Sequence, residues 1–98
     1  MSQVQVVYWR DIPAQVKVRE GRTRVSRPLG PRFQEAIDAA AMRAGASATD
    51  DYLAEWRTSD PTDRPGAPGV IADAVASELE SAYPPERLMK LAENGGRE

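Results

Sequence analysis

The sequence predicts an α+β domain with a small N-terminal antiparallel sheet of three strands, packed by two helices and followed by a Pro/Gly-rich linker and one or two C-terminal helices. Three observations support this class. Residues 4–25 alternate in the manner of strands, residues 32–44 and 70–83 carry apolar side chains at helical spacing, and residues 58–69 are rich in Pro and Gly. The predicted divisions are a core domain at 1–57, a linker at 58–69 and a helical segment at 70–94.

The first predicted strand covers residues 4–9. Val4, Val6 and Tyr8 alternate there with Gln5, Val7 and Trp9, so both faces carry apolar side chains. This pattern indicates an interior strand, or one covered on both sides. The strand should end at residues 10–13, because Pro13 lacks an amide donor and restricts the residue before it.

Residues 15–25 predict a β-hairpin with a two-residue turn at Glu20 and Gly21, which fixes the register. Like charges directly opposite each other cost a few tenths to about 1 kcal/mol, so we expect an acidic group over the cationic face. The predicted pairs are Val18 with Thr23 and Val16 with Val25 on one face, and Arg19 with Arg22 and Lys17 with Arg24 on the other, with Arg27 just beyond.

The helices have clear start and stop signals. Pro31 suits the first turn of the helix at 32–44, and Gly45 is a natural C-terminal stop. Residues 47–51 predict the start of a short second helix near 49–57, with Tyr52, Leu53 and Trp56 on its apolar face. After the helix at 70–83, Pro85 opens a last short helix that ends at residues 94–96.

Composition excludes several classes of function. The chain has 98 residues, no Cys and no His, which removes disulfides, thiolate metal sites and Cys-His or Ser-His catalysis. We expect no cofactor, no metal and no enzymatic activity. No targeting segment or membrane-length apolar run is present, so we expect a cytoplasmic protein.

Charge is polarised along the chain, although the net charge is only -2. Residues 1–30 hold six basic and two acidic side chains, whereas residues 58–98 hold four basic and eight acidic ones. The cationic hairpin face therefore has three interpretations: a face that is solvated or neutralised by the acidic C-terminal helices, a site for an acidic protein, or a site for nucleic acid or another polyanion. The acidic pI of about 5.2 and the lack of a nucleic-acid-binding motif oppose the last.

Two further clusters of side chains have alternative interpretations. Tyr8, Trp9, Arg10 and Asp11 could stack on and orient a planar ligand, or they could be core aromatics beside a local ion pair. Asp50, Asp51 and Glu55 are interpreted as helix capping and solvated surface rather than a cation site.

The amphipathic helix after Gly69 could dock on a partner or pack back on the sheet, and the opposite charges of the two halves favour packing back.

Three segments carry a family resemblance: residues 6–16 (VVYWRDIPAQV), 32–38 (RFQEAID) and 51–56 (DYLAEW). They resemble the bacterial virulence factor family of short stand-alone proteins, over about residues 3–57. A similar segment occurs in the larger conserved virulence factor C proteins, beside an Nfu-type region and helical repeats. The resemblance implies a bacterial protein linked to virulence, with no defined chemistry and no site residues to transfer. The Nfu-type neighbour implies a role in iron-sulfur or cofactor-related housekeeping. Because this chain has no Cys, it could assist such a process but could not hold a cluster.

The expected function is that of a small cytosolic interaction or accessory subunit that docks an acidic partner. Two alternatives stay open: a polyanion-binding module, and an accessory subunit of a one-carbon or cofactor-metabolism enzyme complex that would use Tyr8, Arg10 or Asp11. Self-association also stays open. The expected partner-binding residues are Arg10, Lys17, Arg19, Arg22, Arg24 and Arg27, with the C-terminal helices as a second contact surface.

Overall fold

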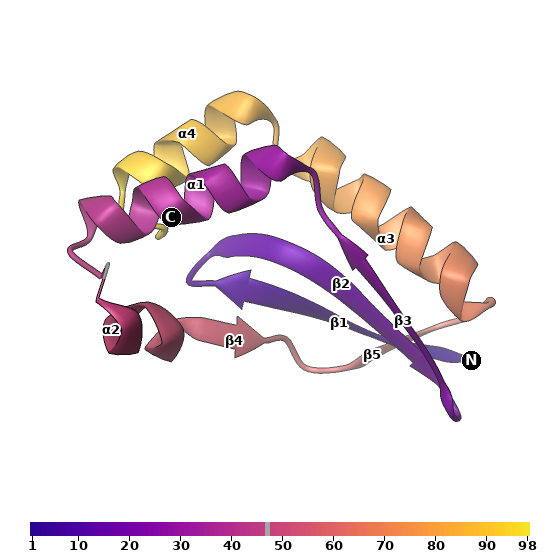
Figure 1. The fold of residues 1–98 in the computed structure, drawn as a ribbon. Coiled ribbons are helices and arrows are strands. Elements are labelled where there is room, and N and C mark those ends of the chain that lie inside the picture. The colour runs from indigo at the N-terminus through magenta and orange to yellow at the C-terminus, as the bar shows by residue number, and fades with distance from the viewer. Residues whose placement is uncertain (47) are drawn as a thin grey trace.

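The computed structural model describes residues 1–46 and 48–98, and Ser47, the first residue of the predicted second helix start, lies outside them. The described residues form an α+β fold with an antiparallel sheet of five strands and four helices (Figure 1). The elements are β1 (Ser2–Trp9), β2 (Ile12–Glu20), β3 (Thr23–Pro28), α1 (Pro31–Arg43), α2 (Thr49–Ala54), β4 (Trp56–Thr58), β5 (Thr62–Arg64), α3 (Pro68–Ala82) and α4 (Pro85–Glu93).

The sheet has β1 in its interior, as the apolar character of both its faces predicts. The strand order is β3-β2-β1-β4, and β5 pairs with the first half of β1 beyond the end of β4. The sequence predicts three strands and misses β4 and β5, which lie in the predicted second helix and linker. Each is only three residues long and lacks an apolar alternation, so the β1 edge, rather than a local pattern, determines its extended conformation.

The β2–β3 hairpin is shifted from the predicted register. Glu20 pairs with Thr23, so the turn residues are Gly21 and Arg22 rather than Glu20 and Gly21. Gly21 has φ +59°, which suits the first central position of a type II′ turn. The predicted pairs are therefore wrong by two positions, but the division into two faces holds for every predicted residue except Arg27, which lies on the valine face. The observed pairs are Val18 with Val25, Arg19 with Arg24, Lys17 with Ser26 and Val16 with Arg27.

An irregularity between Val7 and Tyr8 changes which β1 side chains face the core. Val4 lies in the core before it, and Trp9, fully buried, lies in the core after it. The predicted alternation, which groups Tyr8 with Val4 and separates Trp9 from them, is wrong at this point. Pro13 lies inside β2 opposite Tyr8, so the turn between β1 and β2 consists of Arg10 and Asp11.

The helices α1, α3 and α4 lie on one side of the sheet (Figure 1). α3 packs over β2 and β3, while α1 packs on β2 and α4. The helix after Gly69 therefore packs back on the sheet. α2 has no buried residue and ends at Ala54, so the expectation that the helix near 49–57 covers the sheet is wrong, and Trp56 belongs to β4. The core contains Val4, Trp9, Ile12, Val16, Val18, Leu29, Phe33, Ala36, Ile37, Ala40, Ala41, Ala46, Ile71, Ala72, Val75, Leu88 and Leu91.

Several local predictions are confirmed. Pro31 begins α1 and Pro85 begins α4, and Gly45 follows the end of α1 with φ +71°. Asp50 and Asp51 lie in the first turn of α2, at the positive end of its dipole. Within residues 1–46 and 48–98, no helix combines the length and the apolar character needed to cross a bilayer.

Candidate functional site

The face of the sheet opposite α1, α3 and α4 is polar and basic. Neighbouring strands place Gln3, Arg19 and Arg24 in one row across it, and Gln5, Lys17 and Ser26 in the next. A hollow of about 540 Å³ lies on this surface, which we call the open face. Its lining residues are Gln3, Gln5, Lys17, Val18, Arg19, Arg24, Val25, Ser26 and Pro61.

The cations of the open face are not neutralised within the described chain. Arg19 and Arg24 lie directly opposite each other, and the Arg19 Nη2 donates a hydrogen bond to Gln3 Oε1 at 2.9 Å. No described carboxylate lies within 4.0 Å of the charged nitrogens of Lys17, Arg19, Arg22 or Arg24. Asp63 on β5 is the acidic residue in the Arg19 row, and Gln3 separates it from Arg19.

The acidic residues of α3 interact with arginines away from the open face. Asp73 pairs with Arg27, Glu78 with Arg64 and Glu80 with Arg32, at 2.7, 3.0 and 3.2 Å. The Glu78 pKa is lowered because its carboxylate accepts hydrogen bonds from Arg64. The interpretation in which the acidic C-terminal helices neutralise the hairpin cations therefore holds for Arg27, which pairs with Asp73 of α3, but not for Lys17, Arg19, Arg22 or Arg24.

The six predicted partner-binding residues do not share one surface. Lys17, Arg19 and Arg24 line the open-face hollow, and Arg22 lies in the turn at the hairpin tip. Arg27 lies on the opposite face, paired with Asp73, because period-two alternation places it with Val25 rather than with Arg24. Arg10 lies beyond the other end of β2, in the β1–β2 turn.

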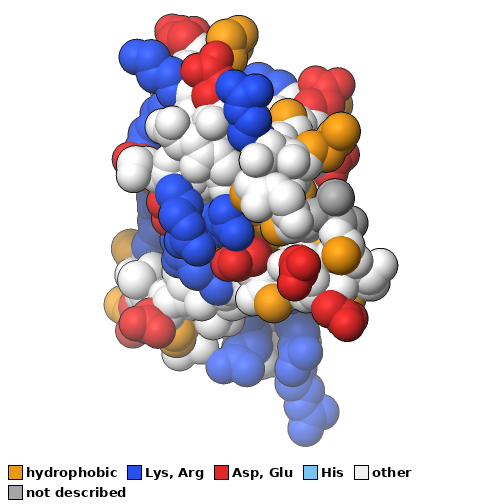
Figure 2. All heavy atoms as spheres, turned by 90° about the vertical axis from the view of Figure 1, so that its left-hand side faces the viewer, with side chains coloured by type: hydrophobic (Ala, Val, Ile, Leu, Met, Phe, Trp, Pro, Cys, Tyr) orange, Lys and Arg blue, Asp and Glu red, His pale blue; other side chains and the backbone are white. Residues whose placement is uncertain are grey.

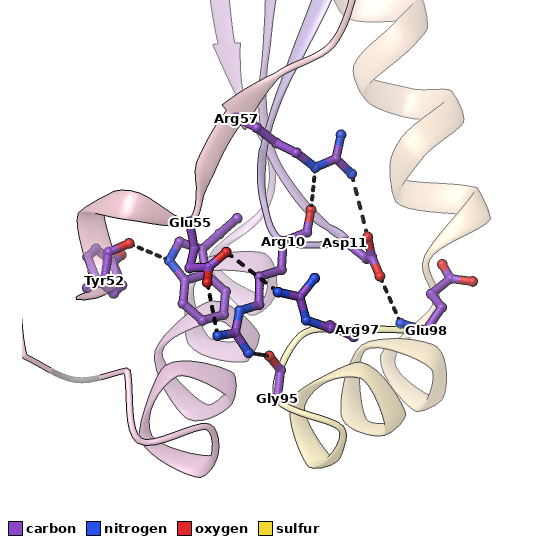
Figure 3. Close-up of polar contacts among 9 residues, drawn as sticks. Arg10, Asp11, Tyr52, Glu55, Arg57, Gly95, Arg97 and Glu98 are labelled. Carbon is purple, nitrogen blue, oxygen red and sulfur yellow. Dashed lines mark hydrogen bonds and ion pairs between the residues drawn. The ribbon is translucent and has the colours of Figure 1, made fainter. Parts of the chain in front are cut away.

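The β1–β2 turn is held by residues that are distant in sequence (Figure 3). Arg10 has φ +53°, and its guanidinium donates to Gly95 O at 2.9 Å and to Glu55 Oε1 at 3.2 Å. It also lies 5.0 Å from the centre of the Trp9 ring. Trp9 Nε1 donates to Tyr52 O at 2.9 Å. Trp9 and Arg10 thus act as structural anchors, and sequence reasoning missed the role of Glu55.

The C-terminal segment closes over the same turn. Asp11 N–H donates to Gly96 O at 2.8 Å, and Glu98 N–H donates to Asp11 Oδ2 at 2.9 Å. Gly95 and Gly96 have φ +68° and +88°, a region that favours glycine. Figure 2 views this side of the molecule, where Lys and Arg side chains lie against Asp and Glu. The segment that follows α4, like the acidic residues of α3, therefore makes its contacts with other parts of this chain.

A second, smaller hollow of about 370 Å³ is lined by only part of the predicted ligand cluster. Tyr8 and Asp11 line it, whereas Trp9 is fully buried in the core. The Arg57 guanidinium lies 4.4 Å from the centre of the Tyr8 ring and 3.6 Å from Asp11 Oδ1. Tyr83 also lines the hollow, and burial raises its pKa. The remaining lining residues are Arg57, Ser59 and Glu98.

Neither hollow has the ligands of a metal centre. In the part of the chain that the structure describes, no group of three or more acidic side chains converges on a point where a cation could bind. The Ser59 hydroxyl accepts a hydrogen bond from Val6 N–H at 2.8 Å, which gives it a structural role at the sheet edge.

These features define a class: a small α+β domain with helices on one side of its sheet and a basic open face on the other. The chain belongs to the virulence factor family, whose family model matches residues 7–92. The match extends beyond the segments that carry the resemblance and includes α3 and most of α4. Comparison with curated proteins and with solved structures finds no match.

Proposed function

We propose that this protein is a small interaction subunit that docks onto an acidic surface of a partner protein through its open face. One observation carries the proposal. Lys17, Arg19 and Arg24 surround a hollow of about 540 Å³ without a carboxylate within ion-pair distance among the described residues, while the acidic residues of α3 pair elsewhere. The charges that could act on a partner are therefore concentrated on one face.

The distribution of ion pairs makes this concentration distinctive. The chain has thirteen Lys and Arg residues, and seven of the arginines form ion pairs within the described part of the chain. Four of the other six, Lys17, Arg19, Arg22 and Arg24, lie on the β2–β3 hairpin. Arg43 and Lys90 are the remaining two, and they lie on α1 and α4.

An acidic partner would relieve an unfavourable arrangement. Arg19 and Arg24 are directly opposite each other, and such like-charge pairs destabilise a sheet by up to about 1 kcal/mol. A carboxylate between them would replace this repulsion by two attractions. Complementary charge of this kind speeds association and sets the orientation of docking, and its effect weakens as salt screens the charges.

A protein partner is favoured over nucleic acid. The net charge is -2, and three cations around one hollow offer few phosphate contacts compared with a nucleic-acid-binding surface. The role in an enzyme complex is not favoured either, because Arg10 binds Glu55 and Gly95, and Asp11 binds Arg57 and the Glu98 amide. Through these contacts both side chains stabilise the fold.

The test compares two matched double variants in a cell-extract capture followed by binding measurements with the recovered partner. Lys17→Ser with Arg24→Ser removes two open-face cations, and Arg43→Ser with Lys90→Ser removes two exposed cations from the helical side. Both changes alter the net charge equally. We expect only the first pair to weaken binding, by about tenfold or more at low salt.

Three results would count against the proposal. Equal loss in both double variants would indicate a general charge effect. Equal retention would place the contact elsewhere on the molecule. Recovery of RNA or DNA instead of protein, with affinity that falls steeply as salt rises, would establish the polyanion alternative.

A further inference from the structure

We propose that the partner supplies an acidic segment in extended conformation, which adds to the sheet as an antiparallel strand beside β3. The inference rests on the proposed function, since it names the form of the acidic partner. β3 stands at one end of the strand order, and β2 is its only strand neighbour among the described residues. Edge strands of this kind present unpaired backbone groups to which another chain can pair.

The register shows which backbone groups β3 offers. Glu20 and Thr23 close the two-residue turn and form a hydrogen-bonded pair, and such pairs alternate along an antiparallel ladder with non-hydrogen-bonded ones. Arg24, opposite Arg19, and Ser26, opposite Lys17, occupy the non-hydrogen-bonded positions. Their N–H and C=O groups therefore point away from β2, toward the free edge. The Ser26 C=O accepts a hydrogen bond from Arg27 Nη1 at 3.2 Å, an exposed contact that an added strand would replace.

The strand offers a short site with a defined end. Pro28 occupies the next outward position and has no N–H to donate. Leu29 N–H is already bound to Ala14 O at 3.0 Å. An added strand would thus form its main contacts with Arg24 and Ser26, two residues apart.

The same two residues connect the edge with the basic hollow. Arg24 and Ser26 line the hollow together with Lys17 and Arg19, so their side chains belong to the open face. In a sheet, residues directly opposite each other place their side chains on the same face. The partner residues opposite Arg24 and Ser26 would therefore point toward the cations, which predicts carboxylates at alternate positions.

The intervening partner residue has a different environment. It would lie opposite Val25, which is half-buried and packs against the core on the helical side of the sheet. An apolar side chain suits that position. The expected recognition pattern is acidic, apolar, acidic in an extended segment.

Charge also argues against a second copy of this chain as the occupant. Two β3 strands side by side would bring together Arg24 from each copy on the open face, next to Arg22 of each turn. Charged side chains and proline on an edge strand are features that oppose pairing between identical edges. The cations that disfavour self-pairing favour an acidic strand.

The test uses synthetic peptides and the full chain labelled with ¹⁵N, observed by NMR. The base peptide alternates Glu and Val, with blocked ends. One derivative carries N-methyl groups on the Glu residues and the other carries the same number on the Val residues. Charge, composition and the number of methyl groups are equal in the two derivatives. They differ only in which edge of the peptide strand has lost its N–H donors.

In an antiparallel addition, the Glu residues opposite Arg24 and Ser26 exchange hydrogen bonds with them. We therefore expect methylation of the Glu amides to weaken binding about tenfold or more, and methylation of the Val amides to leave it nearly unchanged. The amides of Arg24 and Ser26 should show the largest shifts and become protected from exchange with solvent.

The outcomes separate this inference from the proposed function. Equal binding of both methylated peptides, together with loss of binding in the Lys17→Ser, Arg24→Ser variant, would overturn strand addition and leave open-face docking supported. Binding insensitive to both kinds of change would overturn both proposals. Failure of the unmethylated peptide to bind, a reversed methylation pattern, or protection of the β3 amides through self-association would overturn antiparallel addition of an acidic strand.

Discussion

Substitution of Arg10 tests the account of the β1–β2 turn most directly. This residue has two opposing effects on stability. Its guanidinium joins Glu55 and Gly95 to the turn, while its φ of +53° is a conformation that residues with a Cβ adopt at a cost. Replacing Arg10 by Ala removes the contacts and keeps the cost, whereas replacing it by Gly removes both.

The magnitudes follow from the contacts. Hydrogen bonds to charged groups contribute about 1.5–3 kcal/mol each. Arg10 and Glu55 are 15% and 31% exposed, so solvent weakens their ion pair, and we expect Arg10→Ala to lower the free energy of unfolding by about 3 kcal/mol. Relief of the backbone conformation should make Arg10→Gly about 1 kcal/mol more stable than Arg10→Ala.

Urea unfolding followed by tryptophan fluorescence measures the difference, since Trp9 lies against Arg10 and is one of two tryptophans. The control is Glu35, exposed in the middle of α1, where Ala should be more stable than Gly by about 1 kcal/mol. The preferred residue should thus reverse between the two sites. An Arg10→Gly variant no more stable than Arg10→Ala would refute the reasoning.

Two further predictions concern the same end of the molecule. A Cβ at Gly96 would lie 2.9 Å from Trp9 Cζ3 at a φ of +88°, so Gly96→Ala should lower the free energy of unfolding by about 2–4 kcal/mol in urea titration. Gly69→Ala, with no atom within 4 Å of the added Cβ and a position in α3, should instead raise it slightly. Burial raises the Tyr83 pKa above its ordinary 10.0, so the folded state keeps this proton when the unfolded state loses it, and stability should fall as pH rises above about 10. Tyr83→Phe should reduce that fall, as urea unfolding at several alkaline pH values would show; an unchanged pH dependence would contradict it.

Local features of the sequence predicted much of the fold. Pro31, Gly45 and Pro85 mark helix ends through constraints that act within a few residues. The alternation in β2 predicted the basic face, because a shift of two positions leaves every side chain on its original face. The turn itself lies one residue later than predicted, because Gly21, with φ +59°, occupies its first central position rather than its second.

The remaining features depend on contacts between distant residues. Arg10 contacts Glu55 and Gly95, which are 45 and 85 residues away in the sequence, and no local pattern predicts such a contact. The short strands β4 and β5 are formed by pairing with β1 rather than by their own composition. Arg27 is different: alternation already groups it with Val25, so its place on the helical side could have been predicted.

The closure of the C-terminal segment over the β1–β2 turn affects the order of events during biosynthesis. The turn leaves the ribosome before Gly95 and Gly96 are translated, yet its amide at Asp11 and its guanidinium at Arg10 bind the carbonyls of these two glycines. A nascent chain can therefore form the first hairpins while this end of the sheet still lacks its last bonds. Chaperones and proteases would encounter an incompletely closed intermediate until translation passes these two glycines.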